Sequence, residues 1–81
     1  MNVSMGETEL REQLMTENEE YRRLATEHQS YAERLELLKN RHHLSEEEKF
    51  QEIMLKKKKL FLKDQMYSLL QKYRREMAAE S

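Results

Sequence analysis

The sequence of 81 residues contains no cysteine, no proline and no tryptophan, and it contains a single glycine. The absence of cysteine excludes disulfides, thiolate nucleophiles and cysteine-ligated metal sites. No uninterrupted apolar run approaches the roughly 18 residues of a membrane span, and the N-terminus has no basic segment followed by an apolar one. We therefore expect a cytoplasmic protein without a membrane segment.

Charged and apolar residues dominate what is present, at 38% and 37% of the chain. This balance, with almost no helix-breaking residue, is typical of long helices and coiled coils. A chain of this length forms one domain at most and buries only a thin core. The composition predicts an all-α fold that relies on helix packing or on a partner.

Charge is distributed unevenly, although the net charge is only −1. Residues 1–40 hold five basic and nine acidic side chains, whereas residues 41–81 hold ten basic and seven acidic ones. The two halves are therefore electrostatic complements. This pattern favours packing of one half against the other over binding of a polyanion by the whole chain.

The N-terminal half carries a coiled-coil-like seam and predicts a helix over residues 8–40, after a disordered segment at residues 1–6. The seam recurs at steps of four and three residues: Leu10, Leu14, Glu17, Tyr21, Leu24, His28, Tyr31, Leu35 and Leu38. Thr16-Glu17-Asn18-Glu19 has the form of a capping box. The sequence leaves open whether the helix breaks near residue 16 or continues through it.

Periodicity lapses over residues 41–45, which predicts a turn. Asn40 precedes it and is able to end the first helix in a left-handed conformation. Ser45 and Glu48 have the spacing of a capping box, and three consecutive glutamates from Glu46 suit the positive end of a helix dipole. We therefore predict a second helix over residues 46–77.

This second helix has two apolar stripes, and the antiparallel first helix of a hairpin covers only one of them. One stripe comprises Leu55, Leu62, Met66, Leu69, Tyr73 and Met77, and the other comprises Phe50, Ile53, Leu60, Phe61 and Tyr67. Either the segment around Leu10 and Leu14 covers the second stripe, or a second subunit does. We predict a homodimeric four-helix bundle, with a monomeric hairpin as the alternative. The expected hairpin and dimer interface comprises Tyr21, Leu24, His28, Tyr31, Leu35, Leu55, Leu60, Leu62, Met66, Leu69 and Tyr73.

Two sequence elements carry a family resemblance. Tyr21-Arg22-Arg23-Leu24 followed by His28, and Lys59-Leu60-Phe61-Leu62-Lys63-Asp64, resemble the YdcH-like family of small bacterial proteins of unknown function. The resemblance covers about residues 10–70. It implies a helical hairpin, a bacterial origin, and no assigned enzymatic activity or cofactor. The chain departs from the family in its short turn without Gly or Pro.

The basic run offers one candidate for anion binding, through Lys56, Lys57, Lys58, Lys59 and Lys63. Consecutive helical residues point around the helix, however, so they do not form one edge. Solvated charges and cross-helix pairs are the simpler interpretation.

The histidines and acidic residues indicate structure more than chemistry. His42 and His43 are adjacent and lack the spacing of a metal motif, so no metal site is predicted. His28 lies on the seam, where we expect a hydrogen-bonded core histidine. Asp64 has no basic residue three or four positions away, and we expect it to lock the hairpin register by pairing with Tyr21, Arg22 or Arg23.

The function predicted from these features is a non-enzymatic interaction or adaptor protein that binds a second copy or an unidentified protein. No nucleophile with a neighbouring base and no Gly-rich phosphate loop is present, so no catalytic or cofactor-binding residue is predicted. Weak binding of nucleic acid or of an anionic surface through residues 56–63 is the first alternative. A helical co-chaperone with an exposed groove near Met66 and Tyr73 is the second.

Overall fold

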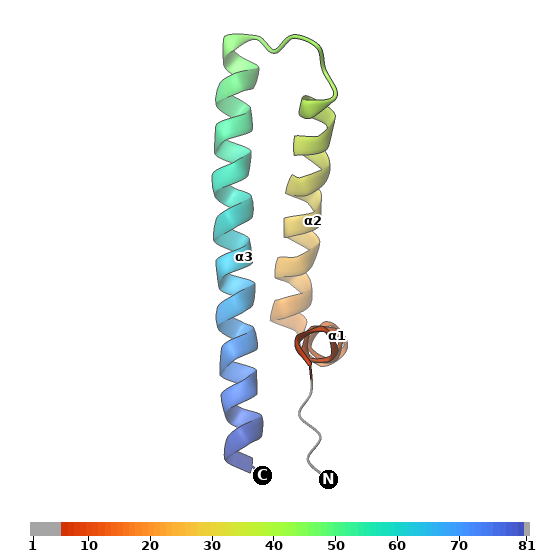
Figure 1. The fold of residues 1–81 in the computed structure, drawn as a ribbon, viewed down its shortest axis with the longest axis vertical. Coiled ribbons are helices and arrows are strands. Elements are labelled where there is room, and N and C mark those ends of the chain that lie inside the picture. The colour runs from red at the N-terminus through yellow and green to blue at the C-terminus, as the bar shows by residue number, and fades with distance from the viewer. Residues whose placement is uncertain (1–5, 81) are drawn as a thin grey trace.

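The computed structural model describes residues 6–80, which form three helices and no strand. The helices are α1 (Glu7–Glu17), α2 (Glu19–Lys39) and α3 (Glu46–Glu80). The all-α class predicted from composition is confirmed. Helices α2 and α3 lie side by side and run in opposite directions (Figure 1). Residues 1–5, for which disorder was predicted, lie outside the described residues.

The length of α3 determines the shape of the molecule. Its 35 residues rise about 1.5 Å each, which gives a rod of roughly 52 Å. The largest dimension of the protein is 56 Å, and the other two are 18 Å. The helix continues past residue 77 through Ala78 and Ala79, because alanine has the highest helix propensity. None of the helices within residues 6–80 combines the length and the apolarity needed to cross a membrane.

The capping box at the start of α3 is confirmed. The backbone N–H of Glu48 donates to Ser45 Oγ at 3.1 Å, and the backbone N–H of Ser45 donates to Glu48 Oε1 at 3.0 Å. Each side chain therefore satisfies an amide that the first helical turn leaves without a partner. The bond that the Ser45 backbone N–H donates to the carboxylate is the main cause that lowers the pKa of Glu48 from its ordinary value, and the positive charge of Arg41 lowers it further.

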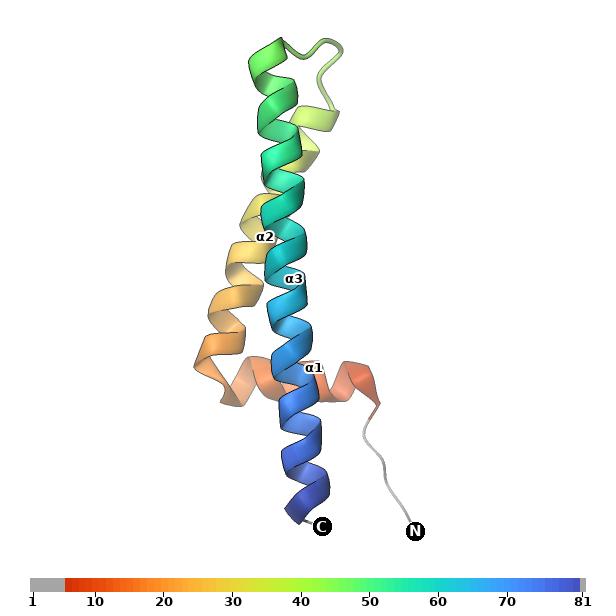
Figure 2. The same cartoon turned by 90° about the vertical axis from the view of Figure 1, so that its left-hand side faces the viewer.

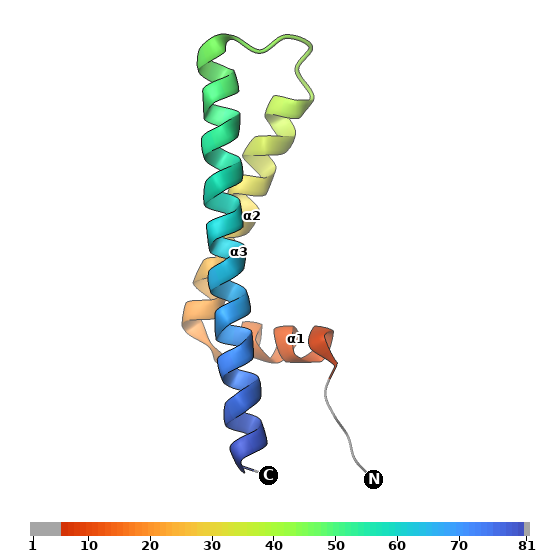
Figure 3. The same ribbon diagram turned by 60° about the vertical axis from the view of Figure 1, so that its left-hand side comes forward.

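The connection before α3 corrects one prediction. Asn40 ends α2 with φ −81° and ψ −2°, so it remains right-handed, and no residue other than glycine within residues 6–80 has a positive φ. The N–H of Arg41 donates to the carbonyl of Leu38 at 3.2 Å. The chain between Lys39 and Glu46 is long enough to reverse without a left-handed residue. Figure 3 shows this connection at one end of the molecule and α1 nearer the other end, where the last turns of α3 extend beyond it.

The chain breaks between α1 and α2 instead of continuing as one helix: α1 ends at Glu17, and Asn18, two residues after Thr16, separates it from α2. Asn18 has an extended backbone, and its Oδ1 accepts the N–H of Tyr21 at 2.8 Å, which caps α2. The Thr16 hydroxyl instead donates to the carbonyl of Glu12 inside α1. Arg22 completes the junction, because its guanidinium donates to the carbonyls of Met15 at 2.9 Å and Thr16 at 3.1 Å. These carbonyls belong to the last turn of α1, which has no helical partner for them.

The core lies where all three helices meet. Its buried members are Leu10, Leu14, Tyr21 and Leu70, with Met66, Leu69, Tyr73 and Met77 packed against them. Figure 2 shows α1 crossing the C-terminal half of α3 instead of running along it. Helix α1 therefore extends the cover over the first apolar stripe of α3. The alternative in which Leu10 and Leu14 cover the second stripe is wrong.

A polar contact between α1 and α3 accompanies this core. The Tyr73 hydroxyl donates to Glu17 Oε2 at 3.0 Å. The predicted register pair of Asp64 with Tyr21, Arg22 or Arg23 is not present: Asp64 is exposed and has no hydrogen bond or ion pair within the described chain. Asp64 follows the buried Leu62 by two residues, or about 200° around the helix, so it points away from α2.

Candidate functional site

The face of α3 opposite the core is uncovered within residues 6–80. We define the outer face by five large side chains, Phe50, Ile53, Leu60, Phe61 and Tyr67, which are between 51% and 63% exposed. Of the predicted interface residues, only Leu60 lies here. Four others are buried, namely Tyr21, Leu24, Leu35 and Leu62, and six are half-buried, namely His28, Tyr31, Leu55, Met66, Leu69 and Tyr73. Ten of the eleven predicted interface residues therefore lie on the inner side of the hairpin, and Leu60 alone lies on the outer face.

The groove predicted near Met66 and Tyr73 is present only in part. Met66 lines a small pocket of about 190 Å³ together with Tyr21, His28 and Leu70, and Tyr73 is not part of the lining. Both side chains are half-buried and pack against the cluster that contains Leu10 and Leu14 of α1. Helix α1 therefore covers part of the apolar surface around Met66 and Tyr73. The seam in the sequence gave no sign that its first two leucines would turn across α3.

The basic run is dispersed around α3 and does not converge on one site. Its exposed members are Lys56, Lys57, Lys58 and Lys63, and Lys59 is half-buried. Lys56 Nζ lies 3.8 Å from Glu52 Oε1, and Lys58 Nζ lies 5.8 Å from the ring centroid of Tyr31. Successive helical residues diverge by about 100°, so these ammonium groups face different neighbours.

His28 lies on the inner seam without the expected hydrogen bond. Its Nε2 is buried and has no hydrogen-bond partner within the described residues, which corrects the prediction of a hydrogen-bonded core histidine. Burial lowers the pKa of His28 from its ordinary value, and the positive charges of Lys59 and Lys63 lower it further. His42 and His43 are exposed in the connection. Residues 6–80 contain no cluster of three or more His, Asp or Glu side chains suited to a metal ion.

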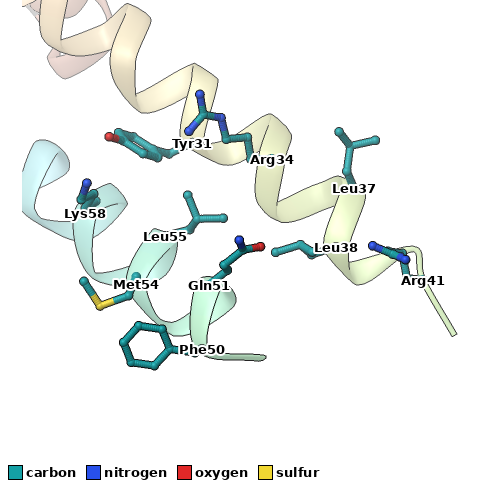
Figure 4. A pocket seen from close by; sticks show the side chains of 10 residues that line it. All are labelled: Tyr31, Arg34, Leu37, Leu38, Arg41, Phe50, Gln51, Met54, Leu55 and Lys58. Carbon is teal, nitrogen blue, oxygen red and sulfur yellow. The ribbon is translucent and has the colours of Figure 1, made fainter. Parts of the chain in front are cut away.

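A groove opens between α2 and α3 near the connection, with a volume of about 520 Å³. We call it the α2–α3 groove. It is lined from the α2 side by Tyr31, Arg34, Leu37, Leu38 and Arg41, and from α3 by Phe50, Gln51, Met54, Leu55 and Lys58. Figure 4 shows Leu38, Gln51 and Leu55 in the space between the two helices, with Tyr31 and Lys58 at one end and Arg41 at the other.

The lining of this groove combines apolar side chains with positive charge. Arg34, Arg41 and Lys58 contribute three cations, and none of the described residues that line the groove is acidic. The Arg34 guanidinium lies 5.7 Å and the Lys58 ammonium 5.8 Å from the centroid of the Tyr31 ring. Both distances are within the range of a cation–π interaction. Arg41 pairs with Glu48. Within residues 6–80, neither Arg34 nor Lys58 forms an ion pair.

Sequence reasoning missed part of this groove and part of the core. Arg34, Leu37 and Met54 were not singled out, and neither was Leu70, which is almost fully buried. Leu37 and Leu70 each belong to a leucine pair, with Leu38 and Leu69. The two side chains of such a pair point about 100° apart on a helix. A leucine pair therefore indicates that apolar contacts extend beyond a single seam.

Comparison of the chain with family models, with curated proteins and with solved structures gives no match. The outer face and the α2–α3 groove are the two candidate surfaces for function in this protein. Both offer apolar contact area with charged side chains around it, which is the chemistry of binding.

Proposed function

We propose that this protein is a non-enzymatic helical interaction module that pairs with a second copy of itself through the outer face of α3. One observation carries the proposal: five large apolar side chains on this face are more than half exposed in a single copy. Isolated apolar residues on a surface are ordinary, but a row of them marks an interaction surface. Two outer faces packed together bring the four long helices of two copies, α2 and α3 of each, into one assembly of six helices. This is our proposal for the homodimer expected from the two stripes of α3.

Charge on the outer face supports an antiparallel pair. Lys57 and Asp64 alternate with Ile53, Leu60 and Tyr67 at steps of four and three residues, so they share one helical row. In a parallel pair, each Lys57 meets Lys57 of the second copy, and each Asp64 meets Asp64. In an antiparallel pair centred near Leu60, each Lys57 lies opposite Asp64 of the second copy. Exposed ion pairs contribute about 0.2–1 kcal/mol each, so they select the orientation while apolar burial provides the affinity.

Static light scattering coupled to size-exclusion chromatography tests the pairing. The wild-type protein should elute with a mass near twice its 10.0 kDa chain. Leu60→Glu places a carboxylate in the centre of the face and should return the mass to that of one chain. Leu37→Glu is the matched control, because Leu37 is also exposed but lies on α2. A wild-type monomer at high protein concentration would refute self-association.

Charge reversal tests the orientation. Lys57→Asp should weaken an antiparallel dimer, since it creates two acidic pairs, and adding Asp64→Lys should restore the association. A parallel dimer would retain like charges at both positions in the double variant, and no restoration is expected. Sedimentation equilibrium at low salt, where surface charge is least screened, measures the difference.

Membership of the YdcH-like family, a bacterial origin and a cytoplasmic location belong to the same proposal. The family and the origin rest on the two sequence elements that end at His28 and Asp64. The location rests on the composition of the chain.

A further inference from the structure

We infer that the α2–α3 groove binds an amphipathic α-helix of another protein, and that this helix carries acidic side chains beside its apolar face. The groove shares Phe50 with the outer face, but the other nine lining residues lie outside that face, and five of them come from the α2 side. The inference therefore stands independently of self-association.

The shape of the groove favours a helix over a small molecule. Leu38, Leu55 and Tyr31 are half-buried along it, whereas Leu37 on its margin is 69% exposed. Sites for small molecules usually enclose 70–90% of the ligand surface, which a groove with such an exposed margin does not do. An open apolar channel between two helices instead accepts the side chains that a third helix presents at steps of three and four residues.

The charge of the groove determines the kind of helix. Arg34 and Lys58 stand at the groove without an ion pair in the described part of the chain, and Arg41 adds a third cation that Glu48 partly neutralises. An approaching basic helix would be repelled, while acidic side chains flanking the apolar anchors would meet unpaired cations. Complementary charge of this kind steers association and rejects partners of the wrong sign.

A second copy of this chain does not fit the groove as well. Its acidic helices α1 and α2 already use their apolar seams, since Leu10, Leu14, Tyr21, Leu24 and Leu35 are buried in the fold. Presenting them to another molecule would require the core to open. The outer face of its α3 is free, but α3 carries nine basic and seven acidic side chains, so its net charge has the same sign as the groove. The occupant is therefore a helix from a different protein.

The experiment begins with a displayed library of helical peptides, selected on the full-length wild-type protein and counter-selected on Leu37→Glu. We expect enriched peptides with apolar residues at steps of three and four and a net negative charge. The best peptide is then synthesised, labelled and titrated by fluorescence anisotropy. Leu37→Glu and Leu37→Gln should each weaken its binding about tenfold or more, as expected for loss of an apolar anchor. The Arg34→Gln and Lys58→Gln double variant should weaken it and reduce its salt dependence.

Matched variants separate this site from self-association. Leu60→Glu should still bind the peptide even as a single chain, and Leu37→Glu should keep the mass of the wild type. Circular dichroism checks that both variants retain the wild-type helix content. Failure to enrich any peptide that distinguishes wild type from Leu37→Glu would overturn the inference, and so would enrichment of basic peptides. Binding of dodecanoate or of anionic vesicles at this groove, with no peptide bound, would assign it to lipid and also overturn the inference.

Discussion

Replacing Leu14 with alanine is expected to detach α1 from the rest of the molecule. Leu14 is fully buried, in a cluster with Leu10, Tyr21 and Leu70. Helix α1 has 11 residues, and isolated helices shorter than about 12–15 residues are marginal in water. Its N-cap is Gly6, which has no side chain with which to cap the helix. The order of α1 therefore depends on its contacts with α2 and α3.

The expected cost follows from the burial of Leu14. Buried Leu→Ala substitutions cost about 2–5 kcal/mol, with the larger values at sites that cannot relax. Because α1 is a single short helix at the surface of α3, it can shift or detach and relieve part of the cavity. We therefore expect about 2–3 kcal/mol. A chain of this length has a free energy of unfolding of about 4–12 kcal/mol, so the loss is a large share of the total.

Urea unfolding followed by circular dichroism measures this loss, at one fixed protein concentration for all variants. Amide hydrogen exchange should show that residues of α1 lose protection first, while the centre of α3 keeps it. Met15→Ala is the matched control, because Met15 lies in the same helix and is 39% exposed. Equal, small losses in the two variants, or unchanged protection of α1 in Leu14→Ala, would refute the role assigned to this core.

Four further predictions concern caps and pH. Ser45→Ala should cost about 1 kcal/mol in urea unfolding; a cost equal to that of an exposed Ser30→Ala change would contradict the capping role. Because the folded pKa of Glu48 is lowered, its contribution is present above the ordinary value of 4.5 and should fade as pH falls through the folded value; Glu48→Gln should remove this dependence. The folded pKa of His28 is also lowered, so the unfolded chain binds the proton first and stability should fall as pH drops below the ordinary value of 6.5. His28→Gln should flatten that part of the pH profile, and an unchanged slope would assign it to another group. Asn18→Ala should cost about 1 kcal/mol while Asn18→Asp retains most of the cap; equal stabilities of the two variants would count against it.

Local chemistry explains which details were predictable. Ser45 and Glu48 form their reciprocal bonds within one helical turn, so their spacing alone predicts the cap. The seam is equally local, because burial follows from a repeat of 3.6 residues. The burial of Leu24, Leu35 and Leu62 agrees with that repeat.

Long-range contacts explain the errors. Thr16 and Asn18 are both able to cap a helix, and only the path of α1 across α3 selects Asn18. The same path brings Glu17 to Tyr73, 56 residues away, which no local pattern reveals. The lack of a basic neighbour on its own helix predicted a partner for Asp64 on the other helix, but Asp64 lies about 200° around α3 from the buried Leu62 and faces away from α2.

The amino-acid sequence by itself determined that the chain is helical, where α3 begins, and that α3 carries two apolar stripes. Each of these follows from spacing within a few turns. Only the tertiary structure decided that α1 packs on the stripe that α2 already covers, because Leu10 and Leu14 bury more completely beside Tyr21 and Leu70 than on an open helix face. That choice leaves the outer face of α3 uncovered, and this face carries the proposed function.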